Sequence, residues 1–295
     1  MRKLSVVLCS IGLAAAAVAA PTASAAPRGG EVPGLVGAQA RAAAGPAADK
    51  FLELRRKRTA ERPPATSAAA QKHTFWGPEP QLNSGADGLV VTQSVTPSLR
   101  LSNTSDVVYA PTMKPTGHSC VEVVTAYGLG QAAQVWAWDW CRSVSPAKVV
   151  TINSSFLANY TTTVDGHPAY TVQEVRTNAS ANTWTASLYN VKTKAWDALF
   201  TQSGSDQSTL DEGWDIFEIY ATHNNATGNA YYCSDARGAV FQSSSIKLRV
   251  GGQWVDATAT NSPLKPTTNP RPSDYDCSTL KFELLSPNTN WRVTV

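Results

Sequence analysis

The 295 residues of the chain carry 25 Lys and Arg against 22 Asp and Glu, a formal net charge of +3. The basic excess lies at the front: residues 1–73 hold 11 basic and 4 acidic groups, and residues 74–295 hold 14 basic and 18 acidic groups. The later part therefore lacks a basic surface that neutralises phosphates, and nucleic acid is not an expected partner. The sequence has no C-x-x-C pair, phosphate-binding glycine loop or dinucleotide fingerprint, so we expect neither a metal nor a cofactor.

Residues 1–25 are predicted to be a signal peptide. Arg2 and Lys3 supply a positive start, residues 4–20 are predominantly apolar, and residues 23–25 have the small side chains of a cleavage site. No later stretch has the roughly 20 apolar residues that a membrane helix needs. We therefore expect a secreted, extracellular protein with no membrane partner after signal removal.

Residues 26–73 are rich in Ala and Pro and poor in Leu, Ile, Val and Phe, a composition typical of disorder or of a marginal helix. A short helix is predicted over residues 47–62, and it ends before Pro63 because a residue that precedes proline is pushed out of the helical region. Within it, residues 55–58 form an exposed basic cluster. The segment is interpreted either as a propeptide with a processing site or as a solvated linker.

From residue 74 the composition changes to Thr, Val, Tyr and Trp with Asn, Gly, Ser and Pro between them, which is typical of strands and turns. Short strands are predicted at 89–96, 119–127, 134–141, 148–156, 169–177, 183–190, 195–201, 214–221, 239–242, 245–250, 253–257, 280–285 and 291–295. Two hairpins are expected, one across residues 191–194 and one across Gly251 and Gly252, since paired glycines accept the positive φ of a tight turn. We predict an all-β fold: an antiparallel β-sandwich, lectin-like or jelly-roll-like, at residues 74–295 after a disordered N-terminal segment.

The cysteines predict two disulfides. Once Cys9 leaves with the signal, four cysteines remain in an oxidising compartment. Closeness in sequence favours the pairs Cys120 with Cys141 and Cys233 with Cys277. Each bond would stabilise the fold by about 3 kcal/mol, because it restricts the unfolded chain.

The segment from Gln134 to Cys141 contains three tryptophans at alternate positions. In a strand, Gln134, Trp136, Trp138 and Trp140 share one face, with the indoles about 7 Å apart. Open to solvent, such a ladder would be a platform that stacks on sugar rings or grips an extended chain. Facing inward, it would be part of the sandwich core, and each indole N–H would need a hydrogen bond.

A second strand places Glu218 on one face with Trp214 and Tyr220. A carboxylate among apolar neighbours either pairs with a donor or has its pKa raised by desolvation, and a raised carboxyl is suited to general acid catalysis. Glu122 and Glu174 repeat this arrangement as weaker candidates. Alternatively, such a glutamate is a structural hydrogen-bond acceptor. Trp214 joins the three indoles as a predicted ligand-binding residue.

The Trp-x-Trp strand that begins at Gln134, and the later strand with Trp214 ahead of Glu218, resemble the glutamic peptidases. That family is a β-sandwich related in architecture to legume-type lectins and glucanases, and it uses a Gln and Glu pair to activate water. The resemblance implies that Gln134 and Glu218 are the catalytic residues of this chain.

Three functions remain open. The first is carbohydrate binding through aromatic side chains, and the second is a secreted hydrolase, glutamic-peptidase-like or glycosidase, that uses Glu218 with Gln134. The third is a non-catalytic structural or interaction protein. The expected partner is an extracellular polysaccharide or polypeptide. Exposed indoles would favour binding, and a cleft that brings Glu218 to Gln134 or to a second carboxylate would favour catalysis.

Overall fold

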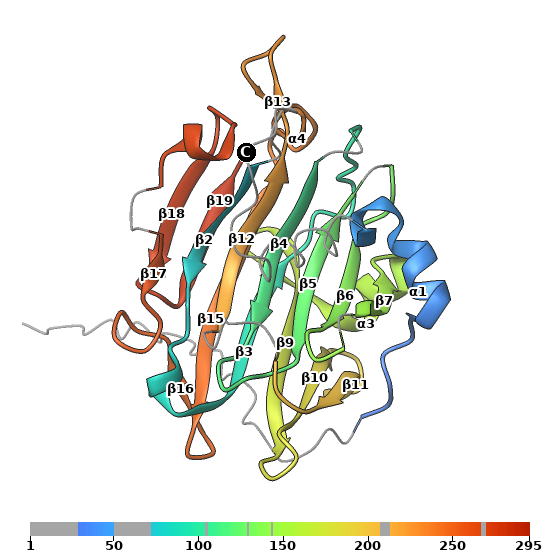
Figure 1. Cartoon of the computed structure of the whole chain (residues 1–295), viewed down its shortest axis with the longest axis vertical. Helices are drawn as coiled ribbons and strands as arrows, with labels where there is room; N and C mark the ends of the chain where they lie inside the picture. Colours follow the sequence, from blue (N-terminus) through green and yellow to red (C-terminus); the bar gives the residue numbers. More distant parts are fainter. Residues whose placement is uncertain are drawn as a thin grey trace, which may run out of the picture.

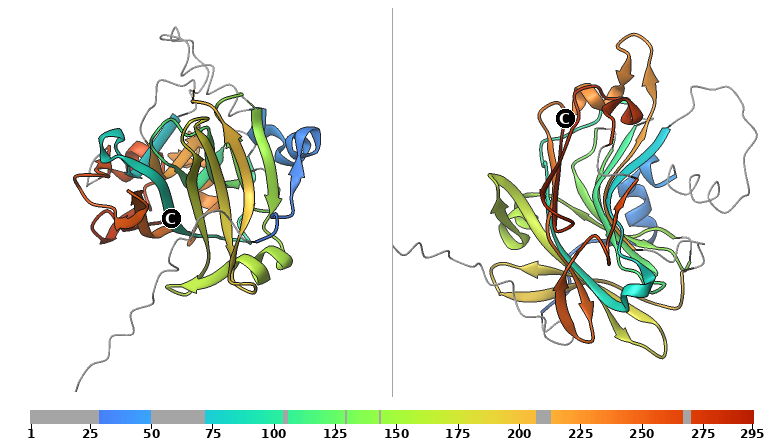
Figure 2. Two further views of the ribbon diagram at one scale, coloured as in Figure 1. Left: turned by 90° about the horizontal axis from the view of Figure 1, so that it is seen from below. Right: turned by 90° about the vertical axis from the view of Figure 1, so that its left-hand side faces the viewer.

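The structure, a computed structural model, describes residues 29–49, 72–103, 106–128, 130–142, 144–206, 213–266 and 270–295. Two antiparallel sheets pack face to face in this part of the chain, which confirms the predicted β-sandwich (Figure 1 and Figure 2). We call the eight-stranded sheet the first sheet and the nine-stranded sheet the second sheet.

The strands of the first sheet, in spatial order, are β1 (Leu35–Val36), β7 (Val144–Thr151), β6 (Gln134–Asp139), β5 (Val121–Tyr127), β4 (Val107–Lys114), β12 (Trp214–Ala221), β2 (Lys72–Pro78) and β17 (Leu264–Lys265). Those of the second sheet are β11 (Ala195–Ser203), β10 (Thr183–Asn190), β9 (His167–Asn178), β3 (Ala86–Ser94), β15 (Val240–Val250), β19 (Asn290–Thr294) and β18 (Lys281–Ser286), with β8 (Thr161–Val164) beside β9 and β16 (Gln253–Asp256) beside β15.

The smaller elements whose bounds are described are the strands β13 (His223–Asn224) and β14 (Asn229–Ala230), the helices α1 (Gly37–Ala44), α3 (Ser154–Tyr160) and α4 (Tyr231–Asp235), and the 3₁₀ turns η1 (Leu82–Ser84) and η2 (Pro272–Tyr275). Within the described ranges, no helix has the length and apolar character needed to cross a membrane.

Both predicted hairpins are present. Strands β10 and β11 pair up to Asn190 opposite Ala195, so their turn covers residues 191–194. Strands β15 and β16 meet at Val250 opposite Gln253. Gly251 and Gly252 between them have φ angles of 57° and 80°, the positive values that the sequence predicted for a tight turn.

Strand β4 was not predicted from the sequence, because Pro111 lies in its middle. Proline cannot donate to a sheet ladder, so its presence argues against a central strand. The structure accommodates it in a bulge, because the pairing of β4 shifts register between Tyr109 and Thr112 against β5 and against β12. As a result Tyr109 and Thr112, three residues apart, belong to the same side of the sheet.

The strand predicted over residues 148–156 ends earlier than expected, because β7 stops at Thr151 and α3 follows. The Asn153 side chain caps this helix by accepting a hydrogen bond from the Phe156 backbone N–H at 3.0 Å. Conversely, the two strands predicted at 239–242 and 245–250 are one strand, β15.

The inner faces of the two sheets enclose the main hydrophobic core. Phe217 and Ile219 of β12 enter it from the first sheet, and Trp184 of β10 and Phe241 of β15 enter it from the second. All four side chains are 0 % exposed. Burying one side chain of this size stabilises the fold by about 1.5–3 kcal/mol relative to leaving it in water.

The carboxylate of Asp215 shares this core. Asp215 of β12 is completely buried and accepts hydrogen bonds from Gln93 Nε2 and from Trp291 Nε1, both at 3.0 Å. Burial raises the pKa of Asp215 to about 6, although these donors favour the ionised form. Asp215 therefore belongs to the polar framework of the core.

Both predicted disulfides are present. Cys120 and Cys141 lie just outside the ends of β5 and β6 that face each other, with 5.1 Å between their Cα atoms. Cys233 of α4 and Cys277, just after η2, have Cα atoms 5.3 Å apart. Both separations lie in the range that a disulfide requires.

Residues 29–49, which we call the strap, run along both sheets. Gly30 N–H donates to Asp197 Oδ1 at 2.8 Å, Glu31 forms a bridge with Ala198 of β11, and β1 then pairs with β7. Helix α1 follows on the outside of the first sheet beside β7, as the blue segment of Figure 1 shows. Tertiary packing stabilises this marginal, Ala-rich helix.

Several N-terminal predictions lie outside the described residues. They are the signal peptide at residues 1–25, most of the helix at 47–62 and the basic cluster at 55–58. The interpretation of residues 26–73 as a propeptide or linker stays a prediction, and the described strap contacts the sandwich.

Candidate functional site

The outer face of the first sheet, on the side opposite the main core, carries the predicted candidates. The predicted alternation is confirmed: Trp136, Trp138 and Trp140 lie together in a second hydrophobic cluster, apart from the core between the sheets. Their exposed fractions are 1 %, 0 % and 1 %. We call this surface the aromatic face; its other main members are Tyr109, Glu122, Gln134, Trp214, Ile216, Glu218 and Tyr220.

The cover of the aromatic face differs from both arrangements that the sequence suggested. The tryptophans are neither open to solvent nor packed between the sheets. They cluster instead with Ala40, Ala44, Ala47 and Ala48 of the strap. Their ligand-binding role stays a prediction, and in this structure the strap contributes to their burial.

The indole N–H groups of Trp136, Trp140 and Trp214 have acceptors on the aromatic face. Trp136 Nε1 donates to Gln134 Oε1 at 2.6 Å. Trp140 Nε1 donates to Glu122 Oε2 at 2.8 Å, and Trp214 Nε1 donates to Glu122 Oε1 at 3.0 Å. Two of the predicted ligand-binding tryptophans therefore hold a carboxylate in place.

Glu122 is the carboxyl group whose titration is most clearly altered on this face. It is 1 % exposed, and it also accepts a hydrogen bond from Thr112 Oγ1 at 2.6 Å. Desolvation and, next, the charge of Glu218 raise the pKa of Glu122 to about 7, against the opposing effect of its three donors. Glu122 therefore carries a proton in acidic solution, and the two carboxyl groups interact electrostatically.

Glu218 lies on β12 and is 4 % exposed. Its Oε1 is 2.6 Å from His73 Nε2 and accepts a hydrogen bond from the Tyr220 hydroxyl at 2.8 Å. The His73 ring stacks on the Tyr220 ring with centroids 4.4 Å apart and an interplanar angle of 9°. Because the His73 side chain is 25 % exposed, it links Glu218 to the protein surface.

His73 was not a candidate in the sequence analysis. It lies at the start of β2, one residue before the change to strand-like composition at residue 74. In the pairing of β2 with β12, His73 lies opposite Tyr220. Recognising Lys72–Pro78 as a strand would have been the sequence signal for His73.

The structure does not bring Gln134 and Glu218 together. In the sheet register Gln134 is opposite Ala126, Ala126 opposite Tyr109 and Tyr109 opposite Glu218, so three strand spacings, roughly 14 Å, separate their backbones. The amide of Gln134 accepts from Trp136 and donates to the Ala43 carbonyl at 2.9 Å.

Tyr109 stands between the two predicted catalytic residues. It is 0 % exposed, and its hydroxyl donates to the Ala47 carbonyl of the strap at 3.0 Å. Burial, followed by the charges of Glu218 and Glu122, raises the pKa of Tyr109 well above its usual value, so the hydroxyl keeps its proton. The sequence analysis missed Tyr109 because it missed β4.

Glu174 lies on β9 of the second sheet, away from the aromatic face. It is completely buried in the interior, accepts a hydrogen bond from the Ser119 hydroxyl, and has a pKa raised well above its usual value by burial. Of the three candidate glutamates, Glu122 and Glu218 therefore share the aromatic face, and Glu174 does not.

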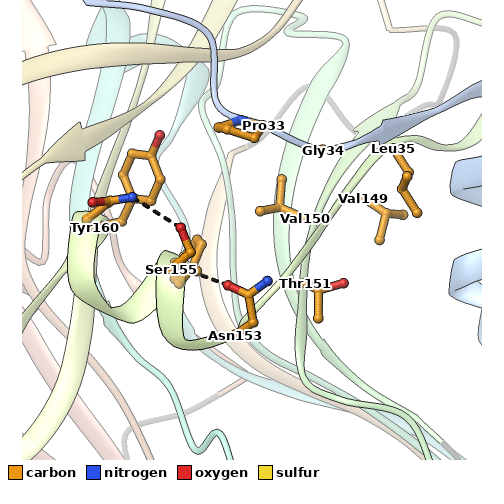
Figure 3. Close-up of a pocket in the computed structure, with 11 residues that line it drawn as sticks. Pro33, Gly34, Leu35, Val149, Val150, Thr151, Asn153, Ser155 and Tyr160 are labelled. Atoms are coloured by element: carbon orange, nitrogen blue, oxygen red, sulfur yellow. Dashed lines mark hydrogen bonds between the residues drawn. The ribbon is translucent and has the colours of Figure 1, made fainter.

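A cavity of about 300 Å³ lies where the strap crosses β7 beside α3 (Figure 3). Its lining is Pro33, Gly34, Leu35, Val149, Val150, Thr151, Asn153, Ser155, Phe156, Asn159 and Tyr160. This set contains amides, hydroxyls and apolar groups but no carboxylate or histidine, so it offers no acid and base pair. Elsewhere among the described residues, no three His, Cys, Asp or Glu side chains gather as a potential metal site.

No family model and no curated protein matches the sequence. Among solved structures, scytalido-glutamic peptidase with a peptide-based transition state analog is similar at a TM-score of 0.43 and 13% identity, over 76% of this chain and 99% of that chain. SCP-B, a member of the eqolisin family of peptidases in complex with the tripeptide Ala-Ile-His, is similar at a TM-score of 0.42 and 11% identity, over 76% and 99%. The chain thus bears a weak resemblance to glutamic peptidases, and its function has to be inferred from its own residues.

Proposed function

We propose that the protein is a secreted hydrolase that acts on an extracellular polymer, with Glu218 and Glu122 as its acid and base groups. The observation that carries this proposal is the electrostatic interaction of two carboxyl groups on one aromatic face, which contributes to raising the pKa of Glu122 to about 7. Glu218 keeps the role predicted from the sequence. We assign Glu122, in place of Gln134, as the second catalytic residue beside Glu218, because the charge of Glu218 contributes to the raised pKa of Glu122.

Hydrolysis requires that one group removes a proton from water and that another gives a proton to the leaving group. Titratable groups whose environments separate their pKa values can divide these roles. Ionised Glu218 would accept the proton of the attacking water. Protonated Glu122, held by Thr112, Trp140 and Trp214, would donate its proton to the leaving group.

Secretion is part of the proposal. It rests on the predicted signal peptide and on two disulfides, which form and persist in oxidising compartments. The strap packs against the aromatic face, so the form with an accessible site would be one in which the strap is displaced or removed.

Carbohydrate binding is the second candidate function. It is favoured by the position of Trp136, Trp138, Trp140 and Trp214 on the outer face of the first sheet. There they cluster with alanines of the strap and not with the second sheet. With the strap displaced, these indoles would be available for stacking on sugar rings.

The test is to assay wild type, Glu218→Gln and Glu122→Gln on denatured protein and on insoluble polysaccharides, at acidic and neutral pH. Each protein is assayed intact and after limited proteolysis of the strap. Loss of a general acid or base should lower turnover by about 100-fold or more. Glu283→Gln on β18 is the matched control, because Glu283 is exposed on the second sheet and should leave turnover unchanged.

The outcomes separate the three functions. Equal turnover by wild type and both site variants would exclude the proposed acid and base roles. Polysaccharide retention without turnover, weakened by Trp214→Ala, would favour carbohydrate binding. Absence of both turnover and retention would leave the non-catalytic interaction protein.

A further inference from the structure

The strap is held on the aromatic face through its main chain. Gln134 Nε2 donates to the carbonyl of Ala43 at 2.9 Å, and the Tyr109 hydroxyl donates to the carbonyl of Ala47 at 3.0 Å. Both donors are buried, at 6 % and 0 % exposure. Because the acceptors are peptide carbonyls, these two bonds do not contact the side chains of the strap.

The two donors form one unit of the sheet. Gln134 on β6 and Tyr109 on β4 lie in the same row, with Ala126 of β5 between them. The small Ala126 side chain leaves room above the sheet for a polypeptide backbone that contacts both donors. The carbonyl of Ala43 belongs to the last turn of α1, where helical carbonyls need partners from outside the helix.

The side chains that the strap presents to the aromatic face are small. Ala40, Ala44 and Ala48 are 0 % exposed, and Ala47 is 7 % exposed, in the same cluster as Trp136. A larger side chain at a fully buried alanine would push the backbone away from the two donors. The face therefore selects small residues at these positions.

We infer that Gln134 and Tyr109 form a binding site for the main-chain carbonyls of polypeptides with small side chains, and that the strap is its intramolecular occupant. The inference deepens the proposed function, on which it rests for the hydrolytic step, by naming polypeptide as the polymer and two residues that position it. Neither residue takes part in the proton transfers assigned to Glu218 and Glu122.

The first experiment measures strap opening in the intact chain. Tyr109→Phe removes one donor, and Gln134→Glu removes the other while keeping an acceptor for the Trp136 indole. Each variant should speed hydrogen exchange of the α1 amides, and cutting within residues 37–49 by a nonspecific protease, by about five- to tenfold. Tyr189→Phe on the second sheet is the control and should leave both rates unchanged.

The second experiment tests selection for small side chains. Ala44→Leu should open the strap by the same two measures, whereas Ala42→Leu should not, because Ala42 is exposed on the same helix. A synthetic peptide that copies residues 37–49 is then added to the Ala44→Leu chain, and binding is followed by tryptophan fluorescence. The same peptide with leucine at position 44 should bind at least about tenfold more weakly, and a glucan oligosaccharide should not compete.

Unchanged strap opening in both Tyr109→Phe and Gln134→Glu would overturn the inference, as would an oligosaccharide that competes with the peptide. Peptide binding without any turnover would uphold it while excluding the hydrolase. In an active protein, Tyr109→Phe should raise KM for a small-residue polypeptide by about five- to tenfold with little change in kcat. If the protein is a hydrolase and neither Tyr109→Phe nor Gln134→Glu changes its KM, this inference is contradicted while the proposed function stands.

Discussion

The main core and the aromatic face are buried to the same degree but by different covers. In the core, Phe217 and Ile219 of β12 meet the large side chains of the second sheet. On the opposite side of the same strand, Ile216 and Tyr220 belong to a cluster that includes strap alanines. Burial alone therefore does not distinguish a structural core from a covered site. The two are distinguished by the segment that covers them, which is a second sheet over the core and an Ala-rich strap over the aromatic face.

The largest expected difference concerns two isoleucines of β12. Ile219→Ala opens a cavity between two sheets that cannot close, so it should lower the free energy of unfolding by about 2–5 kcal/mol. Ile216 faces away from the second sheet, in the cluster that includes the strap alanines, so neighbouring segments can readjust and Ile216→Ala should cost less than half as much. Urea denaturation measures both. Equal losses would mean that the aromatic face is as integral to folding as the core.

The second-largest expected effect is a dependence of folding stability on pH, to which the main core and the aromatic face both contribute. Burial raises the pKa of Asp215 in the core to about 6 and that of Glu122 on the aromatic face to about 7. The folded state therefore binds more protons than the unfolded chain, and stability should be greatest near pH 4 and fall as pH rises to about 7.

For Asp215 this loss is on the order of 3 kcal/mol across that interval. Thermal unfolding at pH 4, 5.5 and 7 measures it as a falling melting temperature. A melting temperature that rises over the same interval would show that paired, ionised carboxylates dominate instead. The strap should loosen over the upper part of the interval, as Glu122 becomes charged beside Glu218.

The smallest expected effect is that of the ion pair within the strap. Arg41 and Asp49 are 2.8 Å apart, but their side chains are 61% and 68% exposed, so water and salt screen the attraction. Asp49→Asn should change the rate of proteolysis within the strap by less than about twofold. A larger change would mean that side-chain charge, and not the two main-chain contacts, holds the strap.

Local sequence signals predicted much of the sandwich. The alternation from Gln134 to Trp140, the glycine pair at 251 and 252 and the cysteine spacing each describe neighbours along the chain, and the structure confirms them. Strand β4 was not predicted, because proline normally argues against a central strand and a bulge accommodates Pro111 here.

The composition of the candidate site was less predictable, because its contacts join distant segments. The bond from Gln134 to the strap spans 91 residues, and the bond from His73 to Glu218 spans 145. Periodicity placed Trp136 and its neighbours on one face but could not say what covers that face. An Ala-rich segment has too few large side chains to reveal, in sequence alone, that it packs against tryptophan.

The strap has a second consequence, for the solubility of the protein. Its residues pair with β7 at the edge of the first sheet and with Ala198 of β11 at the edge of the second. Unpaired sheet edges present rows of N–H and C=O groups that invite pairing with another copy of the chain. A form without the strap would expose both edges at once, and opening the aromatic face would thereby make the protein more prone to aggregation.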